Sequence, residues 1–265
     1  MEPAQLLQVV TLFMFCLGAA VGSFLNVVIL RLPEEGKSIV FPASHCPKCQ
    51  TPLQWYDNIP IMSFTVLAGK CRSCKAAISW QYPLVELVMA LLSVALFRKF
   101  GISTPFIIYF LFCAALLVII VIDYYHQIIP DVISLPGIVL GFGFSFLNPL
   151  ITWKEAGLGL LIGGGILSAI AAGYYVLTKR EGMGGGDIKL LAMIGAFLGW
   201  QCLPFVIFGS SVLGTIVGVG AMIQQKKGGQ TMIPFGPFLS VAAMLYLFFS
   251  LEINTLMINY FTRPA

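Results

Sequence analysis

The chain consists of long apolar runs separated by short polar turns, with one extended polar stretch near the amino terminus. A helix needs about 20 apolar residues to cross the hydrocarbon core of a bilayer. By this measure we predict eight transmembrane helices, at residues 6–29, 84–100, 104–122, 132–148, 156–177, 188–203, 204–223 and 236–253. The sixth and seventh runs are separated only by a tight turn near Gly199 and Pro204.

The composition agrees with this pattern. Of the 265 residues, 58% are hydrophobic and only 10% are charged, whereas a soluble domain averages about 25% charged residues. We therefore predict an all-α polytopic membrane protein that has the lipid bilayer as its main partner. The first apolar run lacks the basic segment and the cleavage site of a signal peptide, so we interpret it as a retained helix.

The basic residues predict the orientation of the helices. Loops 30–83, 123–131, 178–187 and 224–235 share one side, and together with Lys189 they contain 11 of the 15 basic residues. This side should be cytoplasmic, because cytoplasmic loops are enriched in Lys and Arg. The opposite side has Arg98, Lys99, Lys154 and Arg263. The net charge of +4 therefore reflects topology, and we expect no nucleic-acid partner.

The polar stretch is an insert between the first two helices. The predicted organisation is a first transmembrane helix at 1–30, a cytoplasmic insert at 31–83 and a seven-helix region at 84–265. An insert of this size is too small to hold a large core unaided. It contains two CxxC motifs 21 residues apart, with cysteines at Cys46, Cys49, Cys71 and Cys74.

Two such motifs predict a structural Zn²⁺ site like that of a zinc ribbon, because four thiolates can surround the metal tetrahedrally. Four cysteines leave no open metal position for chemistry. The alternative is disulfides or free thiols, although a reducing cytoplasm argues against disulfides. His45 is an alternative ligand.

Two aspartates lie where an apolar run meets a polar turn, at Asp123 and Asp187. A carboxylate near a membrane is costly unless it is hydrated, paired or functional. Asp187 follows Gly182-Met-Gly-Gly-Gly186, a run that lets backbone or substrate approach closely. The alternative role for Asp187 is to cap the following helix.

Asp123 ends the third predicted helix, where the helix dipole disfavours a negative charge. Asp131 follows Pro130, and we expect it to cap the fourth helix; it is the second choice for a catalytic partner. Glu86 lies inside the second predicted helix and requires a polar partner.

Two close carboxylates share one proton, so the ionised member can activate water while the neutral member polarises a carbonyl, as in aspartic proteases. The sequence has no Gly-x-Ser-x-Gly or His-Glu-x-x-His motif, which serine and zinc peptidase mechanisms would use.

Taken together, these motifs resemble the type IV prepilin peptidase family, polytopic aspartic proteases of bacterial inner membranes. Gly184-Gly-Gly-Asp187 matches the Gly-x-Gly-Asp motif of the family, and Asp123 matches the first aspartate of its Asp-x6-Ile-Pro-Asp region. The paired CxxC motifs also match, as do Gly22-Ser-Phe-Leu-Asn-Val-Val-Ile-Leu-Arg-Leu-Pro33 and Tyr82-Pro-Leu-Val-Glu-Leu87. The resemblance covers about residues 18 to 190, with a weaker match at Ile233-Pro-Phe-Gly-Pro237.

The resemblance implies an enzyme with two activities. It would cut the basic leader from type IV prepilins or type II secretion pseudopilins after a glycine, on the cytoplasmic side, with Asp123 and Asp187 as catalytic residues. It would then methylate the new amino terminus with S-adenosylmethionine as methyl donor. The family associates methylation with the cysteine-bearing region, where the position carried over is Gly69.

Two other functions fit parts of the pattern. A proton-coupled transporter also uses carboxylates within the membrane, but it predicts internal repeats that the sequence does not show. A non-enzymatic assembly scaffold would use the zinc insert for docking and would leave the glycines beside Asp187 unexplained.

Overall fold

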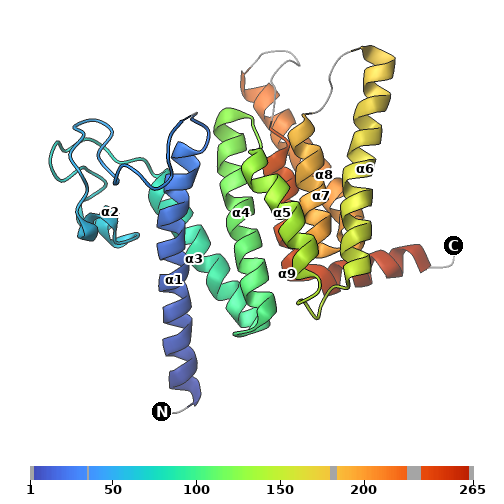
Figure 1. Cartoon of the computed structure of the whole chain (residues 1–265), viewed down its shortest axis with the longest axis horizontal. Coiled ribbons are helices and arrows are strands. Elements are labelled where there is room, and N and C mark those ends of the chain that lie inside the picture. The colour runs from blue at the N-terminus through green and yellow to red at the C-terminus, as the bar shows by residue number, and fades with distance from the viewer. Residues whose placement is uncertain (1–2, 35, 180–183, 226–233, 263–265) are drawn as a thin grey trace. The chain divides into compact units, whose positions relative to one another are not determined.

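The computed structural model describes residues 3–34, 36–179, 184–225 and 234–262 (Figure 1). Among these residues the secondary structure is helical, with two isolated β-bridges in the insert. The chain divides into two compact units, Met1–Val118 and Ile119–Ala265, and the division falls within one helix, α4 (Thr104–His126). We call them unit 1 and unit 2.

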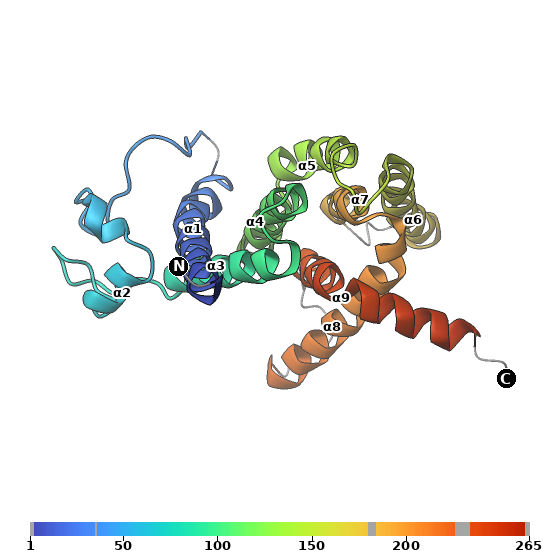
Figure 2. The ribbon, with the colours of Figure 1, turned by 90° about the horizontal axis from the view of Figure 1, so that it is seen from below.

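Unit 1 is built on a close pair of helices, α1 (Pro3–Arg31) and α3 (Gln81–Phe100), which lie side by side in Figures 1 and 2. Glycines on α1 allow this approach. A Cβ at Gly18 would lie 2.6 Å from the carbonyl oxygen of Met89, and one at Gly22 would lie 2.7 Å from the Cα of Glu86. Small residues of this kind let helix backbones pack closely in membranes.

The insert joins α1 to α3 and has little regular structure. It contains a 3₁₀ turn, η1 (Trp55–Asn58), and a short helix, α2 (Met62–Val66). Among its described residues between 32 and 80, only Cys46 and Cys71 are buried. The insert therefore lacks an apolar core of its own, as its size predicts.

Unit 2 is organised around α7 (Gly185–Leu198), which packs against α5 (Asp131–Phe144) and α6 (Trp153–Thr178). Every residue of α7 from Leu190 to Leu198 is buried. The contact with α6 is backbone to backbone, because a Cβ at Gly159 would overlap the carbonyl oxygen of Gly195.

The remaining elements of unit 2 follow α7 in the chain. A 3₁₀ turn, η2 (Trp200–Cys202), leads into α8 (Leu203–Gln225), and α8 packs against α9 (Gly236–Thr262).

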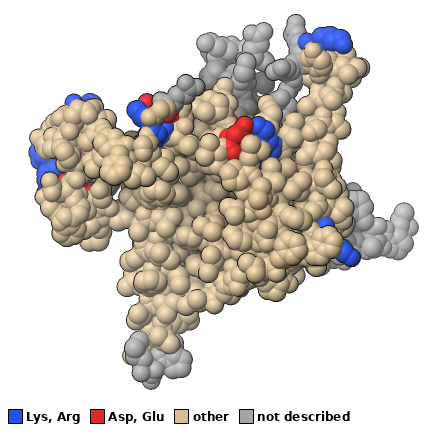
Figure 3. All heavy atoms as spheres, in the orientation of Figure 1, with Lys and Arg blue, Asp and Glu red and all other residues tan. Residues whose placement is uncertain are grey.

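Each predicted transmembrane segment corresponds to a helix, but not all of these helices qualify as spans. Within the described residues, five stretches are long and apolar enough to cross a membrane: Ala4–Arg31, Thr104–His126, Trp153–Thr178, Trp200–Gly220 and Gly236–Met257. Most of the face shown in Figure 3 carries no Lys, Arg, Asp or Glu, as expected of a surface in contact with lipid.

Two predicted helix ends are wrong. We predicted helices at 132–148 and 188–203, whereas α5 and α7 have 14 residues each and end at Phe144 and Leu198. At about 1.5 Å per residue, each is roughly 21 Å long, shorter than the hydrocarbon core of about 30 Å. Apolar residues continue beyond both ends, but they form turns. Gly199, with a φ of +79°, ends α7.

Some expectations lie outside the described residues. They concern Gly182 and Met183 of the glycine run, Ile233 of the carboxyl-terminal motif, and the basic residues Arg180, Lys226, Lys227 and Arg263.

Candidate active site and metal centre

Asp123 is a buried carboxylate near the carboxyl end of α4, in the part that belongs to unit 2. Its side chain is 4% exposed. Its Oδ2 accepts a hydrogen bond of 3.0 Å from the backbone N–H of Gly236, the first residue of α9. A residue 113 positions away in the sequence therefore fixes one oxygen of Asp123 and leaves the other for a different partner.

Asp187 is the third residue of α7 and belongs to none of the five candidate spans. Burial raises the pKa of its carboxyl to about 6, and the negative charge of Asp123 acts in the same direction. The structure thus brings the two aspartates close enough to interact. Gly184 occupies the N-cap position of α7, so Asp187 is not the capping residue.

Ile129 packs against two glycines, Gly186, which precedes Asp187 in the chain, and Gly236, whose N–H bonds to Asp123. A Cβ at Gly186, next to Asp187, would lie 2.9 Å from the Cβ of Ile129. A Cβ at Gly236 would lie 3.0 Å from the Cδ1 of the same side chain. At Gly186 and Gly236 a larger side chain would therefore clash with Ile129. Gly185 is different, because a Cβ there would meet no atom of the described residues within 4 Å.

Asp131, the second choice for a catalytic partner, is exposed and forms an ion pair with Lys189. Both carboxylate oxygens accept from Lys189 Nζ, at 2.7 and 2.8 Å. The expectation that Asp131 caps its helix is wrong: Pro130 is the N-cap residue of α5 and Asp131 is the first helical residue. Its charge is satisfied by a lysine from α7.

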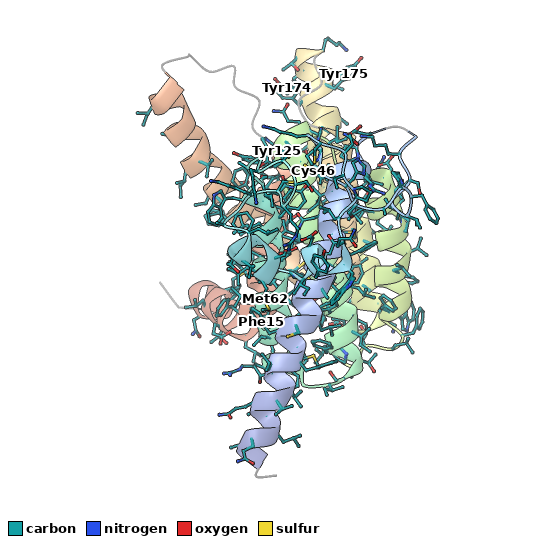
Figure 4. All side chains as sticks on the ribbon, turned by 90° about the vertical axis from the view of Figure 1, so that its left-hand side faces the viewer. Phe15, Cys46, Met62, Tyr125, Tyr174 and Tyr175 are labelled. Carbon is teal, nitrogen blue, oxygen red and sulfur yellow. The ribbon has the colours of Figure 1, made fainter. Side chains whose placement is uncertain are left out.

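The four cysteines of the insert converge within unit 1, and Figure 4 labels Cys46 there. Their sulfur atoms all lie within 4.8 Å of one another, with 3.8 Å between Cys46 and Cys74 and 4.0 Å between Cys49 and Cys71. Zn–S bonds of about 2.3 Å in a tetrahedron require sulfur atoms about 3.8 Å apart. The cluster could therefore bind a metal of this kind.

The two CxxC motifs adopt the same backbone conformation. Gln50 and Lys75, each directly after the second cysteine of its motif, both have a φ of +57°. Their N–H groups donate to the carbonyl oxygens of Cys46 and Cys71, at 2.9 and 3.0 Å. This repeated turn presents two sulfur atoms from each motif to one point, which is the arrangement that a zinc ribbon needs.

Local hydrogen bonds favour the thiolate form at Cys49 and Cys71. The hydroxyl and then the backbone N–H of Thr51 lower the pKa of the Cys49 thiol to about 6. The backbone N–H groups of Cys74 and Ser73 lower the pKa of Cys71. At Cys74 the backbone N–H of Ala76 lowers the pKa of the thiol, but desolvation and the other three cysteines together raise it to about 11. His45 is not part of the cluster, and its Nδ1 lies 3.1 Å from the carbonyl oxygen of Ala43.

Gly69 lies in a turn of the insert with a φ of +68°, a conformation that favours glycine. A Cβ there would lie 3.1 Å from the ring of Phe64.

Comparisons with known proteins match two successive segments of the chain to two family profiles. Residues 16–100 match the profile described as Bacterial Peptidase A24 N-terminal domain, and residues 110–219 match that of the Type IV leader peptidase family. A protein of Pseudomonas aeruginosa named prepilin leader peptidase/N-methyltransferase is 39% identical over 267 residues, covering 91% of this chain and 92% of its own. The chain belongs to the type IV leader peptidase family.

Other relatives carry the same name. The protein of Pseudomonas putida is 35% identical over 96% of this chain and 94% of its own, and that of Aeromonas hydrophila is 36% identical over 88% of each. No solved structure matches the chain. These bacterial relatives, with the five apolar helices, indicate a bacterial membrane protein. The family favours a peptidase over the transporter and scaffold alternatives.

The two matched segments separate the two candidate sites. The first contains all four clustered cysteines, and the second contains Asp123 and Asp187. Gly236 lies beyond the second segment. The motif around Gly236 is visible in the sequence, but its contact with Asp123 exists only in the folded chain.

Proposed function

We propose that this protein cleaves the leader peptide from prepilins or the related pseudopilins and then methylates the new amino terminus. The observation that carries this proposal is that Asp123 lies close enough to Asp187 for its charge to raise the pKa of Asp187, within the segment that matches the leader peptidase family. The name shared by the relatives supports both activities.

Cleavage requires one ionised and one protonated carboxyl group. The raised pKa of Asp187 favours its protonated form, so Asp187 is assigned to polarise the scissile carbonyl. Asp123 is assigned to accept a proton from the attacking water. The hydrogen bond from Gly236 to Oδ2 orients the Asp123 carboxylate, and its other oxygen would hold the water.

No atom of the described residues would meet a side chain at Gly185, and such a position is suited to a substrate in extended conformation. A protease needs its substrate unwound at the bond it cuts, and a backbone without side chains permits close approach. We assign the space beside Gly185, at the start of α7, to the substrate residues around the scissile glycine bond.

The metal bound in the insert would be Zn²⁺, held by Cys46, Cys49, Cys71 and Cys74. Its role would be structural, since it replaces the apolar core that the insert lacks. Removing the metal should therefore disturb the insert before it disturbs the two aspartates.

Methylation would use S-adenosylmethionine, which supplies an electrophilic methyl group on a sulfonium ion. The amino nitrogen of the cleaved substrate loses a proton and attacks the methyl carbon. The carbon–sulfur bond breaks and sulfur keeps its electron pair, so one proton is released for each methyl group transferred.

The excess of basic residues in one set of loops supports insertion in the inner membrane with Asp123 and Asp187 on the cytoplasmic side. A basic leader would remain at that surface, because anionic lipid and the membrane potential hold it there. The apolar pilin segment would enter the bilayer, which places the scissile bond at the boundary. We propose further that the chain crosses the membrane eight times and that α5 and α7 are two of these spans.

The test uses purified full-length protein in detergent, a prepilin and S-adenosylmethionine, with products followed by mass spectrometry. The expected products are the free leader and a mature chain that gains one methyl group at its amino terminus. An intact prepilin after incubation with folded protein would contradict the proposal.

A further inference from the structure

Unit 1 contains a cavity between α1, α3 and the insert that the peptidase mechanism does not use. Its volume is about 1230 Å³. Cavities that hold a small organic ligand are typically about 300–1,000 Å³. This space, which we call the insert cavity, is therefore large enough for a small molecule together with the end of a peptide.

Glu86 of α3 is a carboxylate on the wall of the insert cavity, and it is only 7% exposed. Its Oε2 accepts a hydrogen bond of 2.7 Å from the backbone N–H of Ile61, and the hydroxyl of Ser23 bonds to the same carboxylate. These are the polar partners that the sequence requires for Glu86. Both are neutral, so no cation among them balances the charge of Glu86.

Asn26 of α1 lies on the same wall and is 2% exposed. Its Nδ2 donates to the carbonyl oxygens of Tyr82 and Gly22, at 3.1 and 3.3 Å. Within the described part of the chain, its Oδ1 has no hydrogen-bond partner. Buried polar atoms are nearly always bonded, so an unpaired acceptor at a cavity wall indicates a ligand or water that donates to it.

The close packing of α1 on α3 brings these groups together. Gly22 lies against the Cα of Glu86, and Ser23 and Asn26 follow within one turn of the same helix. Aromatic side chains complete the lining, contributed by Phe24 and by Phe64 of the insert. The insert cavity therefore offers a carboxylate, an unpaired acceptor and aromatic surfaces, which suit a cation, an N–H group and a planar base respectively.

We propose that the insert cavity binds S-adenosylmethionine, with the Glu86 carboxylate facing the sulfonium ion and Asn26 Oδ1 accepting from an N–H group of the ligand. This inference rests on the proposed methylation and deepens it by assigning the residues of the donor site. The chemistry of the lining fits the ligand, because a negative charge nearby stabilises a sulfonium ion and an aromatic or apolar surface accommodates an adenine ring.

Gly69 is not on the wall of the insert cavity, but it lies against Phe64, and Phe64 lines that wall. A side chain at Gly69 would push this ring. The structure thus gives Gly69 an indirect connection with the proposed donor site, as a positioning residue.

The test compares two ligands that differ in charge. S-adenosylmethionine carries the sulfonium, whereas S-adenosylhomocysteine has a neutral sulfur. Binding of each to full-length protein in detergent is measured by isothermal titration calorimetry. Glu86→Gln keeps the shape of the side chain and an acceptor for Ile61 N–H, but it removes the charge. Glu86→Gln should lower the affinity for S-adenosylmethionine by about tenfold or more, and the affinity for S-adenosylhomocysteine by less than about threefold.

Ser93→Ala is the matched control. Ser93 is also a buried polar residue of α3 bonded to α1, through its Oγ and the carbonyl oxygen of Met14 at 2.8 Å, but it does not line the insert cavity. Its replacement should leave the affinities for both ligands unchanged. Binding of S-adenosylhomocysteine to Glu86→Gln also shows that the variant is folded.

Equal weakening of both ligands by Glu86→Gln, or no weakening of either, would overturn the assignment of Glu86 to the sulfonium. If the wild type cleaves and methylates a prepilin while Glu86→Gln keeps full affinity for S-adenosylmethionine, the methyl donor binds elsewhere. Absence of cleavage by the wild type would instead contradict the proposed function.

Discussion

Replacing Gly236 with alanine tests how closely cleavage depends on the position of Asp123. The new Cβ would lie 2.5 Å from Asp123 Oδ2 and 3.0 Å from Ile129 Cδ1. Non-bonded heavy atoms prefer separations of about 3.5–4.0 Å. The carboxylate must therefore move by about 1 Å, although the N–H group that bonds to it is still present.

A displacement of about 1 Å in an active site can reduce the rate by about 10²-fold. We therefore expect Gly236→Ala to lower the kcat for leader cleavage by about 100-fold, equivalent to about 2.7 kcal/mol in the activation barrier. The KM should change much less, because Gly236 orients a catalytic group and is not assigned to substrate binding. The assay is cleavage of a full-length prepilin by purified variant, followed over time by gel electrophoresis.

Gly209→Ala is the control, because it adds the same atom to a helix of unit 2 where there is room. The nearest neighbour of its Cβ would be that of Ala242 at 3.7 Å, an ordinary contact. Gly209→Ala should cleave at the wild-type rate. If folded Gly236→Ala also cleaves within about threefold of wild type, catalysis does not depend on the position that Gly236 gives to the Asp123 carboxylate, and the reasoning is refuted.

Three further predictions follow from the site. Because the raised pKa keeps Asp187 protonated up to about pH 6, cleavage should fall as the pH rises through that value, and a rate that climbs across it would contradict our assignment of Asp187. Cys49→Ser should reduce bound zinc, measured by metal analysis, and impair methylation before cleavage; unchanged metal content would argue against the cluster as its site. Replacing the glycine before the cut with a bulky residue should slow cleavage far more than removing one leader lysine, and the opposite order would show that leader charge dominates recognition.

The helices could be predicted from apolar runs, but their ends could not. Hydrophobicity does not distinguish a buried turn from a helix, so residues after Leu198 looked like more helix. Gly199 ends α7 because it adopts a positive φ. A hydrophobicity pattern contains no information about this backbone angle.

The candidate site residues could be predicted from the sequence where they belong to a local motif. The cysteines and the two aspartates stand out because their neighbours in sequence are unusual for their surroundings. The contact between Asp123 and Gly236 was not predictable, because it joins residues 113 positions apart. The ion pair between Asp131 and Lys189 was missed for the same reason, and Asp131 was assigned to helix capping instead.

The central claim is that Asp123 and Asp187 together perform cleavage, and its most direct test is leader cleavage by Asp123→Asn and Asp187→Asn. An amide has the size of the carboxyl group but cannot exchange the proton. Both variants should insert and fold yet leave the prepilin intact, whereas Asp131→Asn, which breaks only the exposed ion pair with Lys189, should remain active. Cleavage that survives Asp123→Asn or Asp187→Asn, or that is lost only in Asp131→Asn, would contradict the account.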